Sequence, residues 1–294
     1  MYIAITITMT CWSLIDFDVI EEGGKTECML QDIIKMSVQW RDQKVSEEVK
    51  CMMMTDFIVA TSQGEDVGIL DFDTVFKCIK DNTHDAKNKT RRVQETHNLM
   101  SACRYLEDVI YISQETDMMG LVDVKTLVLD LHRLLLNNVD GHLTPGGIFS
   151  TRRRLTVYND VVYEYPKFDT QDEAWRAVQC VIDRYNALIY ETNIMTDQNE
   201  KFLCVYKCAT WLFVELVSLH PFSDGNGRLA RLLCGYCLRL ITPFFTPLSL
   251  NRHEDVSDGI VSARQKGQPV KLTRLLIETS WMLWRGWIKR LIVT

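Results

Sequence analysis

The sequence predicts an all-α fold that is interrupted by one small β-hairpin. Three segments, at residues 202–217, 229–236 and 281–291, carry apolar residues at the three- and four-residue spacing of a helix that buries one face. Residues 151–166 are instead rich in Val, Tyr and Thr, with Asn159-Asp160 at their centre, which is the composition of a short hairpin. The 294 residues are enough for a large core and fit one or two domains.

The N-terminal part predicts a strand followed by one helix. In residues 1–16, Ile3, Ile5 and Ile7 alternate with smaller residues, which is the pattern of a strand. This segment lacks a basic start and is too short to cross a bilayer, so we expect neither a signal peptide nor a membrane span. Residues 17–55 mix charges with apolar residues and predict a single helix packed on the core.

The amino-acid composition limits the partners, metal sites and compartments that we expect for this chain. A net charge of -6 gives no electrostatic reason to expect nucleic acid. The ten cysteines are scattered, many of them in apolar helical segments, and none forms a set with zinc-ligand spacing. Reduced cysteines in the core account for them, which favours a reducing compartment, the cytoplasm or the nucleus; a small number of disulfides is the alternative.

The most informative segment is His220-Pro-Phe-Ser-Asp-Gly-Asn-Gly-Arg228, followed by Arg231. The helical pattern of residues 202–217 ends at His220, and a second amphipathic pattern begins at Leu229, so the segment between them forms a helix N-terminus. Gly225 and Gly227 can adopt backbone angles that other residues avoid, and the N–H groups at a helix start point at any anion placed above them. The segment therefore predicts a phosphate site.

Each residue type in this segment fits one role in phosphate chemistry. His220 has an ordinary pKa near neutrality, which suits a general base. Asp224 offers the hard oxygen that Mg²⁺ prefers, and Asn226 can donate its amide to a phosphate oxygen. Arg228 and Arg231 are three residues apart on one helix face, and both can form bidentate hydrogen bonds with phosphates. Taken singly, each residue also fits a helix–helix turn flanked by surface charge, with His220 interacting with the helix dipole.

Taken together, these residues match the H-P-F-x-[D/E]-G-N-G-R-x-x-R signature of the Fic family in every specified position. The resemblance covers roughly residues 55–280. Residues 93–106 are similar to the first core helix of that family, and residues 129–135 resemble its next helix. The resemblance implies an orthogonal helical bundle and the activity of a protein adenylyltransferase.

The predicted hairpin has a place in this resemblance. Pro145 to Phe149 stand where the family has a Gly-aromatic-Arg segment, although Ser150 replaces the arginine. Residues 151–166 stand where the family has a flap that holds the backbone of a target protein by strand addition. Arg152 to Arg154, beside the flap, predict a solvated run of charge that could also select acidic targets.

The implied reaction transfers AMP from ATP to a Ser, Thr or Tyr hydroxyl of a target protein. The resemblance assigns the proton transfer to His220, Mg²⁺ to Asp224, and stabilisation of the α-phosphate to Asn226 and the backbone of Gly225 to Gly227. Arg228 and Arg231 would hold the leaving pyrophosphate. Two alternatives stay open: removal of AMP from a protein by the same site, and a non-catalytic nucleotide-binding module. A homodimer is compatible with the resemblance.

A weaker motif lies upstream. Thr61 and Glu65 fit the [S/T]-x-x-x-E-[G/N] pattern of the inhibitory helix in self-regulated Fic proteins, whose glutamate pairs with the second motif arginine, here Arg231. Asp66 departs from the last position of the pattern, and Gly64 is a poor residue inside a helix. The alternative is that Glu65 is a solvated loop acid. Residues 69–79 resemble the helix that follows the inhibitory element.

These comparisons divide the chain into four segments: an N-terminal extension (1–54), an inhibitory-helix region (55–92), a Fic domain (93–280) and the end of a C-terminal helix (281–294). Residues 252–264 resemble the late helix that borders the nucleotide, with Val256 in place of its usual tyrosine. Trp281, Trp284 and Trp287 predict a helix packed in the core.

Overall fold

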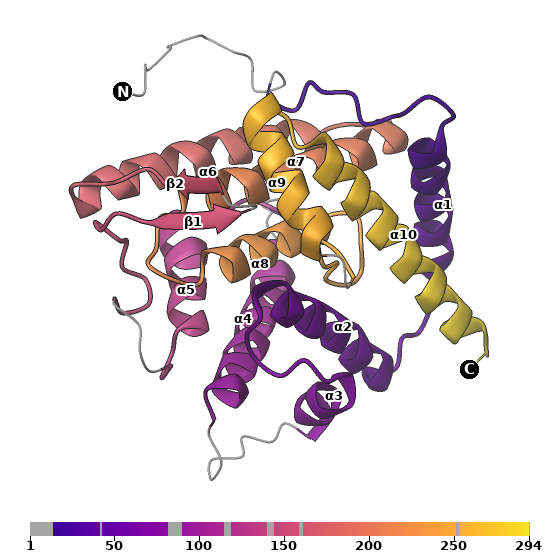
Figure 1. The fold of residues 1–294 in the computed structure, drawn as a ribbon. Helices are drawn as coiled ribbons and strands as arrows, with labels where there is room; N and C mark the ends of the chain where they lie inside the picture. Colours follow the sequence, from indigo (N-terminus) through magenta and orange to yellow (C-terminus); the bar gives the residue numbers. More distant parts are fainter. Residues whose placement is uncertain are drawn as a thin grey trace.

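The computed structural model describes residues 14–41, 43–81, 90–114, 119–139, 144–158, 161–250 and 253–293. It confirms the all-α fold with one hairpin (Figure 1). The strand predicted around Ile3 to Ile7 lies outside the described residues. In chain order the elements are α1 (Lys25–Trp40), α2 (Glu47–Glu65), α3 (Phe72–Asp81), α4 (Arg91–Gln114), the π-helix η2 (Val124–Leu129), α5 (Asp130–Leu135), β1 (Leu155–Tyr158), β2 (Val161–Glu164), α6 (Gln171–Asn193), α7 (Gln198–Leu219), α8 (Asn226–Leu238), α9 (His253–Lys266) and α10 (Val270–Val293).

Helix α7 forms the centre of the core. It is apolar and long enough to cross a membrane, but 72% of its most apolar window is buried, by packing against α1, α6, α8 and α10. Asp197 begins the helix by accepting hydrogen bonds from the N–H groups of Asn199 and Glu200. His220 ends it in the left-handed conformation, with φ 49°. The end of this helix therefore falls at the residue that the sequence predicted.

Helix α8 follows directly and packs along α7 (Figure 1). Gly225 precedes its first residue with φ 76°, a conformation that favours glycine. The helix is buried almost all round, including the side chains of Arg228 and Arg231. Two guanidinium groups thus lie inside the protein, where each needs hydrogen-bonding partners.

The single helix predicted for residues 17–55 is wrong, because the structure has two helices there. α1 ends at Trp40 and α2 starts after Ser46, whose hydroxyl accepts a hydrogen bond from the N–H of Val49. α1 packs on α7 and α10, whereas α2 packs on α3, α4 and α8 (Figure 1). α2 also runs across the boundary that we expected between residues 54 and 55.

The hairpin and the C-terminal helices complete the fold. β1 pairs antiparallel with β2, with Leu155 opposite Glu164. α10 packs against α1 and α9 and buries Trp284 and Trp287, as the sequence predicted for the core. All nine cysteines within the described residues are free thiols.

Candidate functional site

The loop between α7 and α8 is closed by the side chain of Asn226. Its Oδ1 accepts a hydrogen bond from the N–H of Phe222 (2.9 Å), and its Nδ2 donates to the carbonyl of the same residue (2.9 Å). Asn226 is buried, with 4% of its surface exposed. These two bonds hold the loop in shape; the assignment of this amide to a phosphate oxygen stays a prediction.

His132 of α5 holds the same loop from the other side, a role that the sequence did not reveal. The N–H of Gly147 donates to its Nδ1 (2.8 Å), so the proton of the neutral ring lies on Nε2, which donates to the carbonyl of Asp224 (2.9 Å). Its ring stacks on Phe222 with the centres 3.6 Å apart. The one signal in the sequence is a histidine in a short segment that mixes leucines with Asp130 and Arg133, and this alone gives it no role.

His220 lies in an environment that disfavours its charged form. Its ring stacks on Tyr165 with the centres 3.9 Å apart. Burial, and then the nearby charges of Arg154 and Arg264, lower the pKa of His220 to about 4, although Asp224 acts in the opposite direction. The ordinary pKa of histidine, near neutrality, is thus lowered here by burial that the sequence could not show. At neutral pH the imidazole is therefore unprotonated and able to accept a proton.

Arg154 is not part of a solvated charge run, so that prediction is wrong for this residue. It is 9% exposed, and its guanidinium donates to the carbonyls of Ser150 and Pro166 and lies over the ring of Phe168. Arg153 does face solvent and pairs with Glu164 of the opposite strand (2.6 Å). Arg154 therefore fixes the base of the hairpin close enough to His220 to influence its charge.

Arg228 is a buried guanidinium with unused donors. Its side chain is 3% exposed, and its Nη2 donates to Oδ1 of Asp224 (3.2 Å). Its Nε and Nη1 are buried and have no partner among the described residues. Since buried polar groups are almost always hydrogen-bonded, these two donors mark a place for an anion at the start of α8. The carboxylate of Asp224 is half-buried, with 42% of its side chain exposed.

Arg231 is already paired. Its Nε donates to Oε1 of Glu65, the last residue of α2 (2.9 Å), and its Nη2 donates to the carbonyl of Gly64 (3.4 Å). Both side chains are largely buried, at 8% exposed for Arg231 and 24% for Glu65. Glu65 is thus not a solvated loop acid.

Two glycines allow this approach of α2 to α8. A Cβ atom at Gly64 would lie 2.8 Å from the guanidinium of Arg231, and one at Gly227 would lie 2.2 Å from both carboxylate oxygens of Glu65. Gly64 was a poor residue for a helix by sequence, and its place is explained by this contact. Gly227 likewise makes room for Glu65.

The departure at Asp66 also has a structural explanation. Asp66 ends α2 in the left-handed conformation (φ 48°, ψ 41°), which Gly and Asn adopt most readily and Asp tolerates. Arg92 of α4 reaches both its carboxylate (3.4 Å) and the carbonyl of Gly68 (3.1 Å), and Glu95 accepts from the N–H of Gly68 (2.9 Å). α4 therefore holds the chain where α2 ends.

A cavity of about 350 Å³, called here the His220 cavity, joins these parts. His220, Gly227, Arg231 and Glu65 lie in its wall, and α9 contributes apolar residues such as Ile260. Asp224, Gly225, Asn226 and Arg228 are outside this lining, in the adjacent loop and first turn of α8. The volume is within the range of roughly 300–1,000 Å³ that is usual for small-molecule sites.

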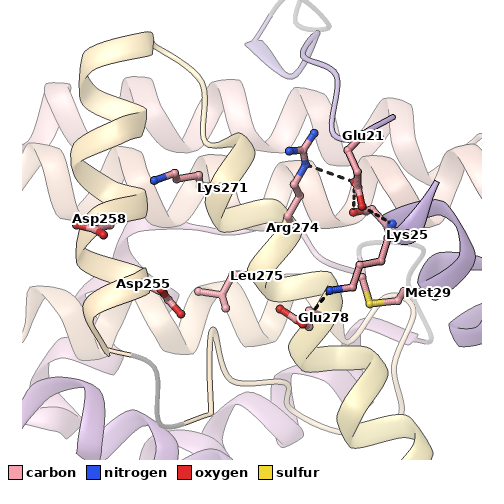
Figure 2. Close-up of a pocket in the computed structure, with 10 residues that line it drawn as sticks. Glu21, Lys25, Met29, Asp255, Asp258, Lys271, Arg274, Leu275 and Glu278 are labelled. Carbon is pink, nitrogen blue, oxygen red and sulfur yellow. Dashed lines mark hydrogen bonds and ion pairs between the residues drawn. The ribbon is translucent and has the colours of Figure 1, made fainter. Parts of the chain in front are cut away.

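A second hollow, between α1, α9 and α10, has a different character (Figure 2). Four of its charged side chains pair with one another, Lys25 with Glu278 (3.5 Å) and Arg274 with Glu21 (3.6 Å). These pairs tie the N-terminal part of the chain to α10. Within the residues that the structure describes, no group of three or more His, Cys, Asp or Glu side chains could hold a metal ion.

Comparison with known proteins finds a family match over part of the chain and a shared fold. Residues 123–238, from just before η2 to the end of α8, match the model of the Fic/DOC family. A ribonucleoside-diphosphate reductase small chain of Ostreid herpesvirus 1 is 34% identical over 152 residues, which are 51% of this chain and 24% of that protein. A Fido domain-containing protein of Dictyostelium discoideum is 31% identical over 90 residues, 29% of this chain and 63% of that protein. The chain thus spans about a quarter of the first relative and less than two thirds of the second.

Three solved structures share the fold. A Fic family protein from Desulfovibrio desulfuricans has a TM-score of 0.65 and 17% identity, over 90% of this chain and 74% of that one. Fic-1 from C. elegans has a TM-score of 0.66 and 18% identity, over 91% and 73%. A Fic domain-containing signaling protein from Bacteroides thetaiotaomicron has a TM-score of 0.69 and 16% identity, over 89% and 97%.

Proposed function

Because this chain contains a Fic/DOC domain, we propose that it is a protein adenylyltransferase, which transfers AMP from ATP to a Ser, Thr or Tyr hydroxyl of a target protein. One observation carries the proposal most strongly. An unprotonated imidazole, His220, and the N-terminus of a buried helix, α8, face the same cavity. A base and an anion-binding helix start are what attack by a hydroxyl on a phosphate ester requires.

In this reaction the hydroxyl oxygen of the target attacks the α-phosphorus of ATP. The bond between that phosphorus and the oxygen bridging to the β-phosphate breaks, and pyrophosphate leaves. The hydroxyl proton passes to the imidazole of His220, which is neutral before the reaction. The negative charge of bound ATP would raise the pKa of His220, and so make it a stronger base when the substrate is present.

The start of α8 is suited to bind the phosphates. The N–H groups around Gly225 to Gly227 belong to the positive end of the helix. The free Nε and Nη1 of Arg228 would each donate to a phosphate oxygen, which would satisfy both buried donors. Arg231 would add a second guanidinium once it is released from Glu65. Asn226 contributes by holding this loop, since its amide already bonds to Phe222.

A Mg²⁺ ion would be held by Asp224. The ion usually takes one or two protein carboxylates and completes its coordination with phosphate oxygens and water. The half-exposed carboxylate of Asp224, next to the start of α8, fits this pattern. When bound, Mg²⁺ would neutralise part of the charge on the phosphates.

We further propose that Glu65 inhibits the enzyme. Its carboxylate occupies the guanidinium of Arg231 and places a negative charge in the wall of the cavity that ATP would enter. ATP must then compete with Glu65 for Arg231, and its phosphates are repelled. Removing this carboxylate should allow a productive position of the α-phosphate.

The test uses ATP labelled at either the α- or the γ-phosphate, with the Glu65→Ala variant and the wild type. Label that reaches protein from the α-position only supports adenylylation. Transfer from the γ-position would mean phosphorylation and would overturn the proposal. If neither label is transferred, AMP release from a pre-adenylylated protein identifies hydrolytic removal of AMP, in which Glu65 would orient the attacking water. If no AMP is released either, the protein is a non-catalytic nucleotide-binding module.

A further inference from the structure

A further cavity adjoins the His220 cavity and has no part in the chemistry above. It measures about 430 Å³, and it shares Tyr163, Tyr165 and Arg264 with the His220 cavity. Its other walls come from α7, including Trp211 and Glu215, and from the residues that follow α9. We call it the flap cavity, because Tyr163 lies on β2 and Tyr165 directly follows that strand.

The ring of Tyr165 lies between the flap cavity and His220, the proposed base. Tyr165, in the wall of the cavity, stacks on His220 with the ring centres 3.9 Å apart. A hydroxyl that reaches His220 brings the neighbouring residues of its polypeptide to this part of the surface. A side chain close to the modified residue can therefore enter the flap cavity.

Glu215 gives this cavity its chemical character. Its carboxylate is half-buried, and it makes no hydrogen bond or ion pair with any described residue. Burial raises its pKa, although the charge of Arg184 on α6 acts in the opposite direction. A desolvated carboxylate without a close partner is unfavourable, and a ligand that brings a positive charge or N–H donors would relieve this.

The other charged residues in the wall are already satisfied. Arg264 donates to the hydroxyl of Ser218 (3.1 Å) and to the carbonyl of Val217 (3.2 Å), and its guanidinium lies 5.4 Å from the centre of the Tyr165 ring. Glu164 pairs with Arg153 outside the cavity. Among the charged residues described in this wall, Glu215 is thus the one that makes no hydrogen bond or ion pair.

We propose that the flap cavity is a subsite for a basic side chain, Lys or Arg, that lies close in sequence to the modified hydroxyl of the target. The aromatic rings of Tyr163, Tyr165 and Trp211 can contact the aliphatic part and the charge of such a side chain. Glu215 pairs with its charged end. The link to the modified hydroxyl rests on the proposed adenylyltransferase activity, whereas binding of a cation in the cavity does not.

The experiment measures binding and transfer separately. Dye-labelled short peptides carry a central threonine and one lysine, which is moved position by position along the peptide; matched series carry norleucine or glutamate instead. Binding to the wild-type protein is followed by fluorescence anisotropy, and AMP transfer to the same peptides is followed with the Glu65→Ala variant. At one or two positions we expect lysine to bind about tenfold more tightly than norleucine, the size typical of a charge-assisted hydrogen bond.

Two variants then identify the residue responsible. Glu215→Gln keeps the shape of the side chain and should abolish the preference for lysine, while Glu164→Gln, a change at the exposed and already paired carboxylate, should leave it intact. The inference is overturned if no position favours lysine over norleucine in the wild type, if glutamate is favoured, or if the preference survives Glu215→Gln. A lysine preference in binding without AMP transfer would refute the proposed function but keep the subsite. AMP transfer without any preference for lysine would refute the subsite but keep the proposed function.

Discussion

The loop between α7 and α8 and the end of α2 both lie next to α8, which α2 contacts through the Glu65–Arg231 pair, but they are held in different ways. The loop is bonded from several directions by buried groups: His132 on one side, Asn226 within it, and the N–H of Ser150, which donates to the carbonyl of Pro221 (2.8 Å). The end of α2 reaches the site through one ion pair and one long hydrogen bond.

This difference identifies the loop as the fixed part of the site and Glu65, at the end of α2, as the part that can be released. Opening the loop would leave several buried backbone groups without partners, each at a cost of about 1–3 kcal/mol. Releasing Glu65 breaks one charge-assisted contact, which contributes about 1.5–3 kcal/mol. Binding of nucleotide or partner can supply that much free energy, so we expect α2 to move while the loop keeps its shape.

The largest effect is expected from His220→Asn, which removes the base and keeps the loop. Asparagine tolerates the left-handed conformation of this position, so the fold should be preserved. AMP transfer, measured in the Glu65→Ala background, should fall by roughly 10²–10⁴-fold, the usual contribution of a general base. ATP binding, measured by calorimetry, should change little. Transfer at an undiminished rate would show that another group takes the proton.

The burial of His220 should also appear in the pH dependence of stability. Its pKa is about 4 in the folded chain and 6.5 when unfolded, so between these values only the unfolded chain binds the proton. The free energy of unfolding should therefore decrease as pH falls from about 6.5 to about 4, by about 3 kcal/mol for this group. Urea denaturation of the wild type and of His220→Asn checks this. Parallel curves for the two proteins would contradict the burial of an uncharged imidazole.

Glu65→Ala tests the part that can be released. Self-adenylylation should rise about tenfold to a hundredfold, in line with the loss of one charge-assisted pair. Asp66→Asn is the matched control, because it changes the next carboxylate, keeps the left-handed turn and leaves Arg231 paired; it should not activate. Adding Arg231→Ala should cancel the gain. An unchanged or lower rate for Glu65→Ala would argue against inhibition by this residue.

The smallest effect is expected from His132→Phe, which tests whether the loop needs its outside support. Phenylalanine keeps the stacking on Phe222 but removes the hydrogen bonds of His132 to the N–H of Gly147 and to the carbonyl of Asp224. The rate of AMP transfer should drop about tenfold, which corresponds to about 1.4 kcal/mol of activation free energy. Tyr206→Phe is the control, since it removes a buried hydrogen bond between α7 and α10 (2.6 Å) and should affect stability without affecting the rate. If Tyr206→Phe lowers the rate as much as His132→Phe does, His132 contributes only through general packing.

The sequence by itself determined the helices that build the site and the turn that joins them. The spacing of apolar residues predicted the segment that became α7, and the combination of His220, Gly225 and Asn226 marked the turn after it. These features are local: a helix period, a left-handed residue and a helix start depend on residues within a few positions. The hairpin was predictable for the same reason.

The tertiary structure decided which polar groups find partners and which lose water. His132 bonds to Asp224 across 92 residues of sequence, and Glu65 bonds to Arg231 across 166. The resemblance to a known family named the second of these contacts, whereas nothing in the sequence pointed to the first. The surroundings that lower the pKa of His220 likewise include Arg154, and its ring stacks on Tyr165; both residues come from the distant hairpin segment. Desolvation and pairing depend on everything that surrounds a group in space, and for that reason the residue types alone could not fix the charge of the base or the partners of the arginines.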